Sequence, residues 1–519
     1  MTQRTFACCF CLQAIAALAF CPLLALIACS SSSSSPQPTV PPVITTFPAG
    51  GTLAQLSSDP YSIPPGQHAT EVEPHVLANG STLVAAFQVG RIVPGGATDI
   101  GWATSTDDGA TWSHGFLPGL TTGEESGLYD AASDPAVAYD AKHGVWMIAS
   151  LPISSTLQTP AVTISRSTDG KTWQSPVGVD AASLSSDKNW IVCDSWPASP
   201  FYGNCYVEWD DYHNNDQILM STSTDGGQTW GPALTTADGS LGLGGQPLVQ
   251  PNGTVVVPIE AFGFQSTNIA AFSSTDGGAS WTAPVTITAI QAHTDAGGIR
   301  SGPLPSAALD GAGTIWVVWE DCRFRALCAT NDLVYSTSSD GIKWSAVTRV
   351  PIDDTSGTGD YFIPGIGIDP ATSGASAHVA IHFYYYPQTN CTTSTCQLYV
   401  GFVSSANGGS TWNHPLTLAG PMQLGWLPNS QNGLMVGDYV ATAFINGVPH
   451  GVFAVAAANS GTTFNEAIYT SQGLTASAKG RQLSSALDRP LHKLTEPIER
   501  ERPEKGALPP QRKAKRSVK

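Results

Sequence analysis

The sequence predicts an all-β protein made of repeated four-stranded antiparallel sheets. Three observations support this fold class. Glycine and proline are abundant, with 52 and 38 residues, 14 tryptophans are present, and a short turn motif recurs along the chain. Many turn residues combined with many aromatic residues are typical of proteins built from short strands. With 42% hydrophobic and 12% charged residues, the 519-residue chain can also bury a large core.

The repeated motif reads Ser-x-Asp-x-Gly-x-x-Trp, and two of its six copies are one residue shorter. In five copies the Asp carboxylate, and in the sixth copy the side chain of Asn407, can accept hydrogen bonds from N–H groups of a tight turn, and the Gly can adopt a positive φ angle. The Trp can fold back and pack between sheets. The motif is therefore expected to join the third and fourth strands of each sheet. The copies begin at Ser105, Ser167, Ser223, Ser274, Ser338 and Ser405.

The spacing of the motif predicts a β-propeller of four-stranded antiparallel blades, because successive motif tryptophans lie 51 to 68 residues apart. Candidate starts of inner strands precede the motifs and favour seven blades, with six as the alternative. A final blade near 437–470 has no good motif, and an N-terminal strand near Val43–Phe47 is expected to complete it and close the ring. The seven starts are Glu73-Pro74-His75, Asp134-Pro135, Asp187-Lys188-Asn189-Trp190, Gln246-Pro247, Gly302-Pro303, Asp360-Tyr361 and Asp438-Tyr439.

The motif resembles the Asp-box of the sialidase-like superfamily, and the resemblance covers about residues 45–470. It implies a propeller with its site at the mouth of the central channel, on the face opposite the motifs. Gly90-Arg91 matches the family's second strand, but Glu73 or Val72 stands where the family has the first arginine of its carboxylate-binding triad. The resemblance implies a Tyr nucleophile assisted by a Glu. A triad of Arg91, Arg300 and Arg323 is one way in which a sialidase site could still form.

The predicted rim is rich in carboxylates and aromatic side chains, which suit carbohydrates and acid/base hydrolysis of glycosides. Two functions follow from this composition. The first is a glycan-active protein, with an exo-glycosidase as its enzymatic form, and the second is a non-catalytic scaffold that binds carbohydrate or protein. The candidate catalytic residues are Glu208, Glu260, Asp360, Tyr361 and Tyr439. The candidate substrate-binding residues are Arg91, Trp190, Arg300, Glu320, Asp321 and Arg323.

The N-terminus predicts export and lipid anchoring in a bacterial cell envelope, at the outer membrane or the cell surface. Residues 1–28 read as a signal peptide that ends in Leu26-Ile27-Ala28, and Cys29 follows as the residue to be lipidated. Residues 29–42 form a Ser/Pro-rich tether, and residues 43–474 form the propeller. The tail, residues 475–519, is basic and is predicted to be disordered.

Six cysteines of the predicted mature domain fall into three close pairs, which we expect to be disulfides in an oxidising compartment. A metal site is the weaker alternative because the pairs lack CxxC spacing and neighbouring histidines. No cofactor is predicted; an acidic loop could hold a structural calcium ion, although no ligand spacing identifies one. The pairs are Cys193 with Cys205, Cys322 with Cys328, and Cys391 with Cys396.

The charge distribution limits the range of partners. The tail from residue 475 holds 12 basic and 5 acidic side chains, which leaves 11 basic and 35 acidic side chains in residues 1–474. So acidic a domain argues against nucleic acid and against an anionic membrane surface as partners. We therefore expect a monomer that binds a glycan or polysaccharide and contacts the membrane through its lipid anchor only.

Overall fold

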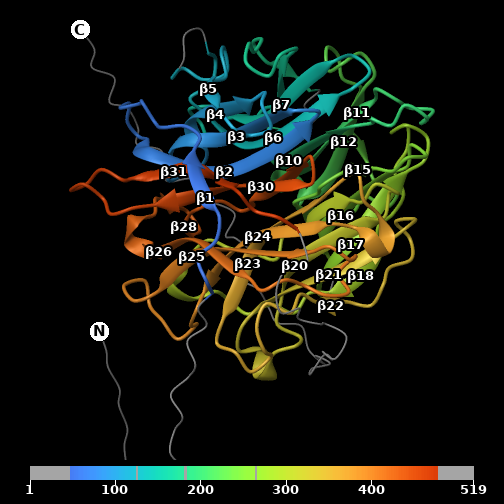
Figure 1. Cartoon of the computed structure of the whole chain (residues 1–519). Coiled ribbons are helices and arrows are strands. Elements are labelled where there is room, and N and C mark those ends of the chain that lie inside the picture. Colours follow the sequence, from blue (N-terminus) through green and yellow to red (C-terminus); the bar gives the residue numbers. More distant parts are fainter. Residues whose placement is uncertain (1–46, 124–126, 180–183, 264–265, 477–519) are drawn as a thin grey trace, which may run out of the picture. The chain divides into compact units, whose positions relative to one another are not determined.

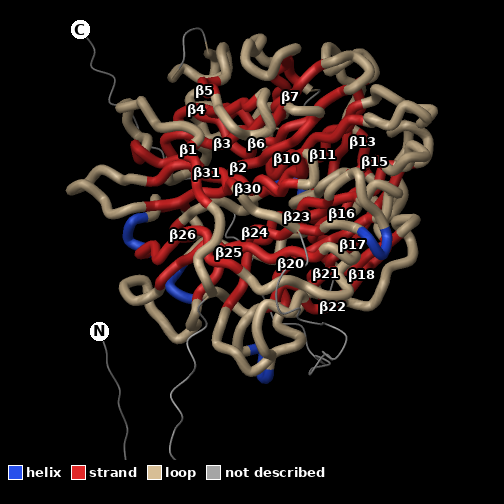
Figure 2. The backbone as a smooth tube through the Cα atoms, in the orientation of Figure 1, coloured by secondary structure: helices blue, strands red, loops and turns tan. Residues whose placement is uncertain are grey.

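The computed structural model describes residues 47–123, 127–179, 184–263 and 266–476. This part of the chain is built from antiparallel β-sheets, as predicted, and its helices are single 3-10 turns (Figures 1 and 2). In it, no helix has the length and hydrophobicity that a membrane span requires. The predicted signal peptide, Cys29, the rest of the predicted tether (29–42) and the tail beyond residue 476 lie outside the described residues.

The first two sheets along the chain are halves of one eight-stranded sheet, joined through a single residue pair, Ala97 with Ala132. The first half contains β2 (Gln67–Asn79), β3 (Thr82–Arg91), β4 (Ala97–Ser105) and β5 (Ser113–Phe116). The second half contains β6 (Ala131–Asp140), β7 (Val145–Ile153), β8 (Thr163–Ser167) and β9 (Val177–Gly178).

Three further sheets follow in the same antiparallel order, and each uses one continuous stretch of chain. The first of them contains β10 (Ser186–Cys193), β11 (Cys205–Asp211), β12 (Gln217–Ser223) and β13 (Leu234–Thr235). In the second, β14 (Gly242–Leu243) and β15 (Leu248–Val249) both pair with β16 (Val255–Phe262), which is followed by β17 (Thr267–Ser274) and β18 (Val285–Ala289). The third contains β19 (Ser306–Leu309), β20 (Ile315–Asp321), β21 (Asp332–Ser338) and β22 (Thr348–Arg349).

The last part of the chain forms two four-stranded sheets and a small hairpin. One sheet contains β23 (Asp360–Ile368), β24 (Val379–Tyr386), β25 (Gln397–Ser405) and β26 (Leu416–Gln423). The hairpin pairs β27 (Asn429–Ser430) with β28 (Gly433–Leu434). The final sheet contains β29 (Ala441–Ile445), β30 (Val448–Ala456), β31 (Glu466–Gln472) and β1 (Thr52–Gln55). The 3-10 turns are η1 (Tyr212–Asn214), η2 (Ala296–Gly298), η3 (Ala326–Cys328), η4 (Gly374–Ser376) and η5 (Leu424–Trp426).

An N-terminal strand completes the final sheet, because β1 pairs along its whole length with β31 (Figure 1). The predicted position of this strand, near Val43–Phe47, was wrong. The strand that pairs is Thr52–Gln55, and Phe47 is not in a strand. The Phe47 ring instead packs 5.1 Å from the ring of Tyr385 on β24, so its aromatic surface is buried against another sheet. Residues 43–46 lie outside the described part.

The repeated motif forms the turn between the third and fourth strands of a sheet, as predicted. In the first copy, the Asp107 carboxylate accepts hydrogen bonds from the Ser105 hydroxyl at 2.8 Å and from the Thr111 N–H at 2.9 Å. The Gly109 N–H donates to the Ser105 hydroxyl at 2.9 Å. The hydrogen bonds from Thr111 lower the pKa of Asp107 to about 2, so this carboxylate is ionised and structural.

The motif tryptophans pack against the sheet that precedes their own, as predicted. The ring of Trp281 lies 6.1 Å from that of Tyr206 on β11, and the ring of Trp412 lies 6.1 Å from that of Tyr335 on β21. Both tryptophans are buried members of hydrophobic clusters that two neighbouring sheets form together. These clusters hold adjacent sheets face to face through apolar burial.

The register of the strands separates the motifs from the predicted rim. On β3 and β4, Leu83 is opposite Ser105, where the motif begins, whereas Arg91 is opposite Ala97. Arg91 and the motif therefore lie at opposite ends of these strands, which agrees with the prediction that the motifs lie away from the site.

Candidate functional site

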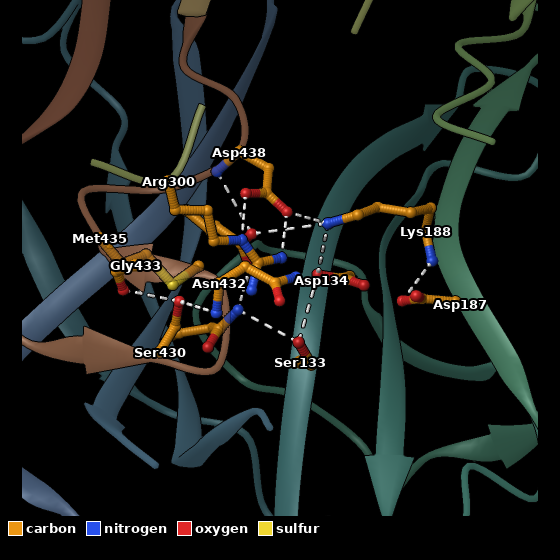
Figure 3. Close-up of polar contacts among 12 residues, drawn as sticks. Ser133, Asp134, Asp187, Lys188, Arg300, Ser430, Asn432, Gly433, Met435 and Asp438 are labelled. Carbon is orange, nitrogen blue, oxygen red and sulfur yellow. Dashed lines mark hydrogen bonds and ion pairs between the residues drawn. The ribbon is translucent and has the colours of Figure 1, made fainter. Parts of the chain in front are cut away.

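Three consecutive first strands carry a β-bulge at which a charged residue has a positive φ angle. The φ angles are 53° at Glu73 on β2, 48° at Asp134 on β6 and 49° at Lys188 on β10. The strand register shifts at each of these positions. Because non-glycine residues seldom adopt this conformation, such bulges serve to redirect a side chain. Here they direct the three charged side chains toward one another. Figure 3 shows Lys188 and Asp134 in this arrangement.

These residues, with Arg300 and Asp438, form what we call the central polar cluster. The Lys188 ammonium lies against the Asp438 carboxylate, 3.8 Å from the nearer oxygen of Glu73 and 4.0 Å from that of Asp134. Arg300 binds both oxygens of Asp438, and its Nε–Oδ1 distance is 2.6 Å. Asp438 is therefore the shared partner of two cations (Figure 3).

Burial and mutual charge give the carboxyl groups of the cluster different proton affinities. Burial and the neighbouring charges of Asp134 and Asp438 raise the pKa of Glu73 well above its usual value. Burial also acts on Asp438, but Arg300 and Lys188 outweigh it and hold the pKa of Asp438 well below its usual range. The cluster thus combines a firmly ionised carboxylate with a carboxyl group that retains its proton more readily.

A small cleft, which Lys188 helps to line, adjoins the cluster. Two of its aromatic side chains, Trp190 and Tyr439, have ring centroids 5.1 Å apart and planes at 80° to each other. Asn189 is only 1% exposed, yet neither its Oδ1 nor its Nδ2 has a hydrogen-bond partner among the described residues. A buried amide without partners is costly, so this side chain is suited to a ligand or to water. The lining residues are Lys188, Asn189, Trp190, Gly244, Gln246, Leu304, Pro305 and Tyr439.

Two buried acids stand behind the cleft on β11. Glu208, which is opposite Trp190 in the sheet register, lies against Gly245, a residue between two lining residues. Asp210 is opposite Asp187. Burial raises the pKa of Glu208 and of Asp210 well above their usual values, and the charge of Asp187 adds to the shift of Asp210. Both groups therefore hold a proton more readily than ordinary carboxyl groups do.

Of the site residues predicted from the sequence, five lie in or beside the cluster and the cleft. Trp190 and Tyr439 line the cleft, Glu208 stands behind it, and Arg300 belongs to the cluster. Arg91 lies near the cluster, whose charges act on it. Its guanidinium donates to the Met435 sulfur at 3.0 Å and to the carbonyl of Gly96. Burial, together with the nearby positive charge of Arg300, lowers the pKa of Arg91 to about 10.

The remaining predicted residues lie elsewhere in the described structure. Arg323 forms a bidentate ion pair with Asp321 and donates to the Ala289 carbonyl at 2.8 Å. Tyr361 is fully buried beneath the Arg325 guanidinium, which lies 5.9 Å from its ring centre. The other three are buried carboxyl groups at strand ends. Asp360 accepts a hydrogen bond from the Asn331 N–H at 2.7 Å, and Glu320 accepts one from the Ile363 N–H at 3.4 Å. Glu260 on β16 is paired with Leu243 of β14 in the sheet register.

The sequence did not single out Asn189, Gln246, Leu304 or Pro305 as site residues. Asn189 and Gln246 belong to predicted inner-strand starts but were not predicted as site residues. The signal that could have identified Asn189 was its polar side chain next to Trp190 in the sequence. Leu304 and Pro305 carry no polar atom in their side chains, so nothing in their chemistry marks them. Among the described residues, no group of three or more His, Cys, Asp or Glu side chains is arranged to hold a metal ion.

The three predicted disulfides are confirmed, and one of them braces the segment that leads to Arg300. The loop closed by Cys391 and Cys396 donates a hydrogen bond from the Thr393 hydroxyl to the Gly297 carbonyl at 2.7 Å. Tyr386, at the end of β24, donates to the neighbouring Ala296 carbonyl at 3.2 Å. The other bonds link Cys193 with Cys205 and Cys322 with Cys328.

Replacing both Cys391 and Cys396 with Ser should lower the free energy of unfolding by about 2 kcal/mol, because the short loop is no longer closed in the unfolded chain. We expect urea unfolding of the oxidised protein to show this loss, together with faster proteolysis at 291–301. Replacing Cys193 and Cys205, a pair far from that segment in the chain, is the control. It should cost a similar free energy without exposing 291–301, and equal proteolysis in the two variants would contradict the bracing role.

No model of a known protein family matches the sequence, and no curated protein matches it in a sequence search. Solved structures do resemble the chain. A protein of unknown function from Dyadobacter fermentans is 15% identical with a TM-score of 0.44, and the match covers 68% of this chain and 99% of that one. A sialidase from Trypanosoma rangeli is 10% identical with a TM-score of 0.42, covering 82% and 60%. An ulvan lyase of polysaccharide lyase family PL25 is 11% identical with a TM-score of 0.42, covering 82% and 94%.

Other similar structures are those of further sialidases and trans-sialidases. At these identities and TM-scores, the activity of this chain has to be argued from its own residues.

Proposed function

We propose that this chain acts on glycans and that the cleft between Trp190 and Tyr439 is its sugar-binding site. The observation that carries the proposal is the buried, unpartnered amide of Asn189 beside these two aromatic side chains. Aromatic faces pack against the C–H groups of sugar rings, while amides exchange hydrogen bonds with hydroxyl groups.

We also propose that the sheets form a closed propeller of seven blades, with the eight-stranded sheet counting as two. The first strands support this arrangement because they contact one another in sequence. β2 contacts β6, β6 contacts β10, β10 contacts β15, β15 contacts β19, β19 contacts β23, β23 contacts β29, and β29 contacts β2. Such a ring has its bulged strand starts around the centre, which is where the polar cluster would lie.

In the enzymatic form of the proposal, the protein is an exo-glycosidase. Burial raises the pKa of Glu208 well above its usual value, so this carboxyl group holds a proton more readily, as a general acid requires. The ionised Asp134 and Asp438 favour the positive charge that develops on a sugar ring during hydrolysis. Glu208 is therefore the candidate general acid, and Tyr439 is a residue that positions the ring.

One observation favours the second candidate function, a binding protein without catalysis. The Tyr439 hydroxyl donates a hydrogen bond to the Pro135 carbonyl at 3.2 Å, and burial raises its pKa well above the usual value. Such a phenol is a poor nucleophile. A scaffold that holds a glycan would need only the aromatic rings and the amide.

Export and anchoring remain part of the proposal. Three disulfides support an oxidising compartment outside the cytoplasm. Lipidation of Cys29, in a bacterial envelope, would then place the domain on a membrane through the Ser/Pro-rich tether. Mass spectrometry of the N-terminal peptide from the purified full chain tests this step.

The glycan proposal is tested with an array of neutral, uronate-bearing and sialylated oligosaccharides, followed by the matching aryl glycosides. Trp190→Ala in the full chain should weaken glycan binding at least about tenfold, since losing about 1.4 kcal/mol of ring contact is a tenfold change. Glu208→Gln should leave binding intact and lower kcat by about 100-fold or more, as expected for a general acid.

Tyr202→Ala serves as the control because Tyr202 lies in a turn before β11, at the motif end of that sheet. It should bind like the wild type. If no glycan on the array binds the wild-type chain, the proposed function is wrong. If glycans bind but no aryl glycoside is hydrolysed, the enzymatic form fails and the scaffold form stands.

A further inference from the structure

We infer that the cleft selects an uncharged sugar ring, recognised through two neighbouring hydroxyl groups, rather than a sugar that carries a carboxylate. This inference rests on the proposed glycan function and names the class of glycan. Four features of the described structure carry it: the pairing of the two cations, the position of Arg91, the unpartnered amide, and the neutral walls of the cleft.

The cations nearest the cleft are already neutralised by the protein. Lys188 is the charged residue among the lining residues, and its ammonium faces Asp438, with Glu73 and Asp134 within 4.0 Å. Arg300 uses two of its donor nitrogens on the same Asp438. A ligand carboxylate would have to displace Asp438 or share its partners with three acidic side chains.

Arg91 does not supply the missing positive charge. It is 3% exposed, and its donors point to the Met435 sulfur and the Gly96 carbonyl. The segment that would have to open for Arg91 to reach a ligand includes Met435, which is itself fully buried. The arginines that the sequence suggested for a carboxylate triad are therefore committed to protein partners, including Arg323 in its ion pair with Asp321.

The amide of Asn189 has the chemistry that a pair of adjacent hydroxyls requires. Its Nδ2 can donate to one hydroxyl oxygen while its Oδ1 accepts from the next hydroxyl, and both atoms lack partners in the described structure. The side chain is 1% exposed, so the wall of the cleft has to move before a sugar hydroxyl can reach the amide. Each unmade hydrogen bond is a cost that a diol would remove.

The rest of the cleft is neutral. Leu304 and Pro305 form an apolar wall, and Gly244 adds backbone without a side chain. Gln246 is uncharged, and its side-chain oxygen already accepts the Ala307 N–H at 2.9 Å. Such walls match the ring carbons and hydroxymethyl group of a neutral sugar.

The test measures binding of the full chain to matched methyl glycosides by calorimetry. The probes are glucoside with glucuronide, galactoside with galacturonide, and mannoside with mannuronide, which differ only in a hydroxymethyl group against a carboxylate. We expect a neutral member to bind at least about tenfold more tightly than its acidic partner. We also expect two adjacent monodeoxy versions of the bound sugar to lose affinity about tenfold each with the wild type, and less than twofold with Asn189→Leu.

Asn252→Leu is the matched control, because Asn252 lies in the turn before β16 and is exposed. It should retain the wild-type preference and the wild-type deoxy effects. Tighter binding of the acidic partner would overturn the inference while leaving the glycan function intact. Deoxy losses that persist in Asn189→Leu would overturn the role of the amide, and failure of every glycan on the array to bind would overturn the proposed function itself.

Discussion

Arg325→Met should lower the free energy of unfolding by about 3–5 kcal/mol, because it removes one partner from a buried ion-pair network. Arg325 is 1% exposed and binds Asp332 at 2.6 Å and Asp353 at 2.5 Å. It also donates to two carbonyls, those of Asp354 at 2.9 Å and Gly357 at 3.2 Å. Methionine fills much of the volume but leaves two carboxylates with a single remaining cation, Arg349.

Urea unfolding followed by fluorescence measures this loss, and Arg166→Met is the control. Arg166 donates to the Gly226 carbonyl at 2.7 Å and to Gln174 at an exposed position, so its removal should cost about 1 kcal/mol or less. Equal losses in the two variants would show that burial of the Arg325 network does not determine its contribution.

Raising the pH from 5 to 8 should destabilise the protein through two other buried side chains, the carboxyl groups of Glu71 and Glu466. Glu71 is fully buried on β2, where its oxygens accept from the Ser57 hydroxyl at 3.1 Å and the Ile468 N–H at 3.2 Å. Burial raises the pKa of Glu71 to about 8. Burial, together with the charge of Glu71, also raises the pKa of Glu466 well above its usual value.

The direction of this pH dependence follows from the number of protons bound in the folded and in the unfolded state. Between pH 4.5 and pH 8 the folded Glu71 keeps a proton that the unfolded residue has released. Folding therefore takes up a proton in this window, and stability falls as the pH rises through it. The contribution of Glu71 is on the order of 3 kcal/mol between pH 5 and pH 8.

Glu71→Gln should remove most of that dependence, since an amide keeps the acceptor for Ile468 and does not titrate. Urea unfolding at pH 5, 6, 7 and 8 measures the slope in the wild type and the variant. Asp108→Asn, at an exposed turn, should retain the wild-type slope. A Glu71→Gln slope as steep as that of the wild type would assign the effect to other buried acids.

Local chemistry explains why the sequence predicted the hairpins well. The Ser, the Asp or Asn, and the Gly of each motif bond to one another within a few residues, as at Ser105, Asp107 and Gly109, so their spacing alone reveals the turn. The final sheet has no such motif. Its fourth strand comes from the other end of the chain, and strand-forming residues both at Phe47 and at Thr52–Gln55 were compatible with the role.

The site was harder to predict because long-range contacts determine it. The start of β23 at Asp360 was predicted correctly, but the bulged residue of that strand is Ile363, three residues later. Tyr361 accordingly packs into the core, where Arg325 covers its ring. The pairing of Arg300 with Asp438 likewise depends on how distant sheets meet, and no local pattern encodes it.

The shared carboxylate of the cluster has a consequence for the order of synthesis. Asp438 follows Lys188 by 250 residues and Arg300 by 138 residues. During translation, both cations leave the ribosome well before the carboxylate that neutralises them is made. The nascent chain must therefore carry Lys188 and Arg300 hydrated, and the cluster assembles only when β29 and its neighbours emerge. An incomplete chain that stops before Asp438 would lack both this counter-charge and the strands that pair with β1.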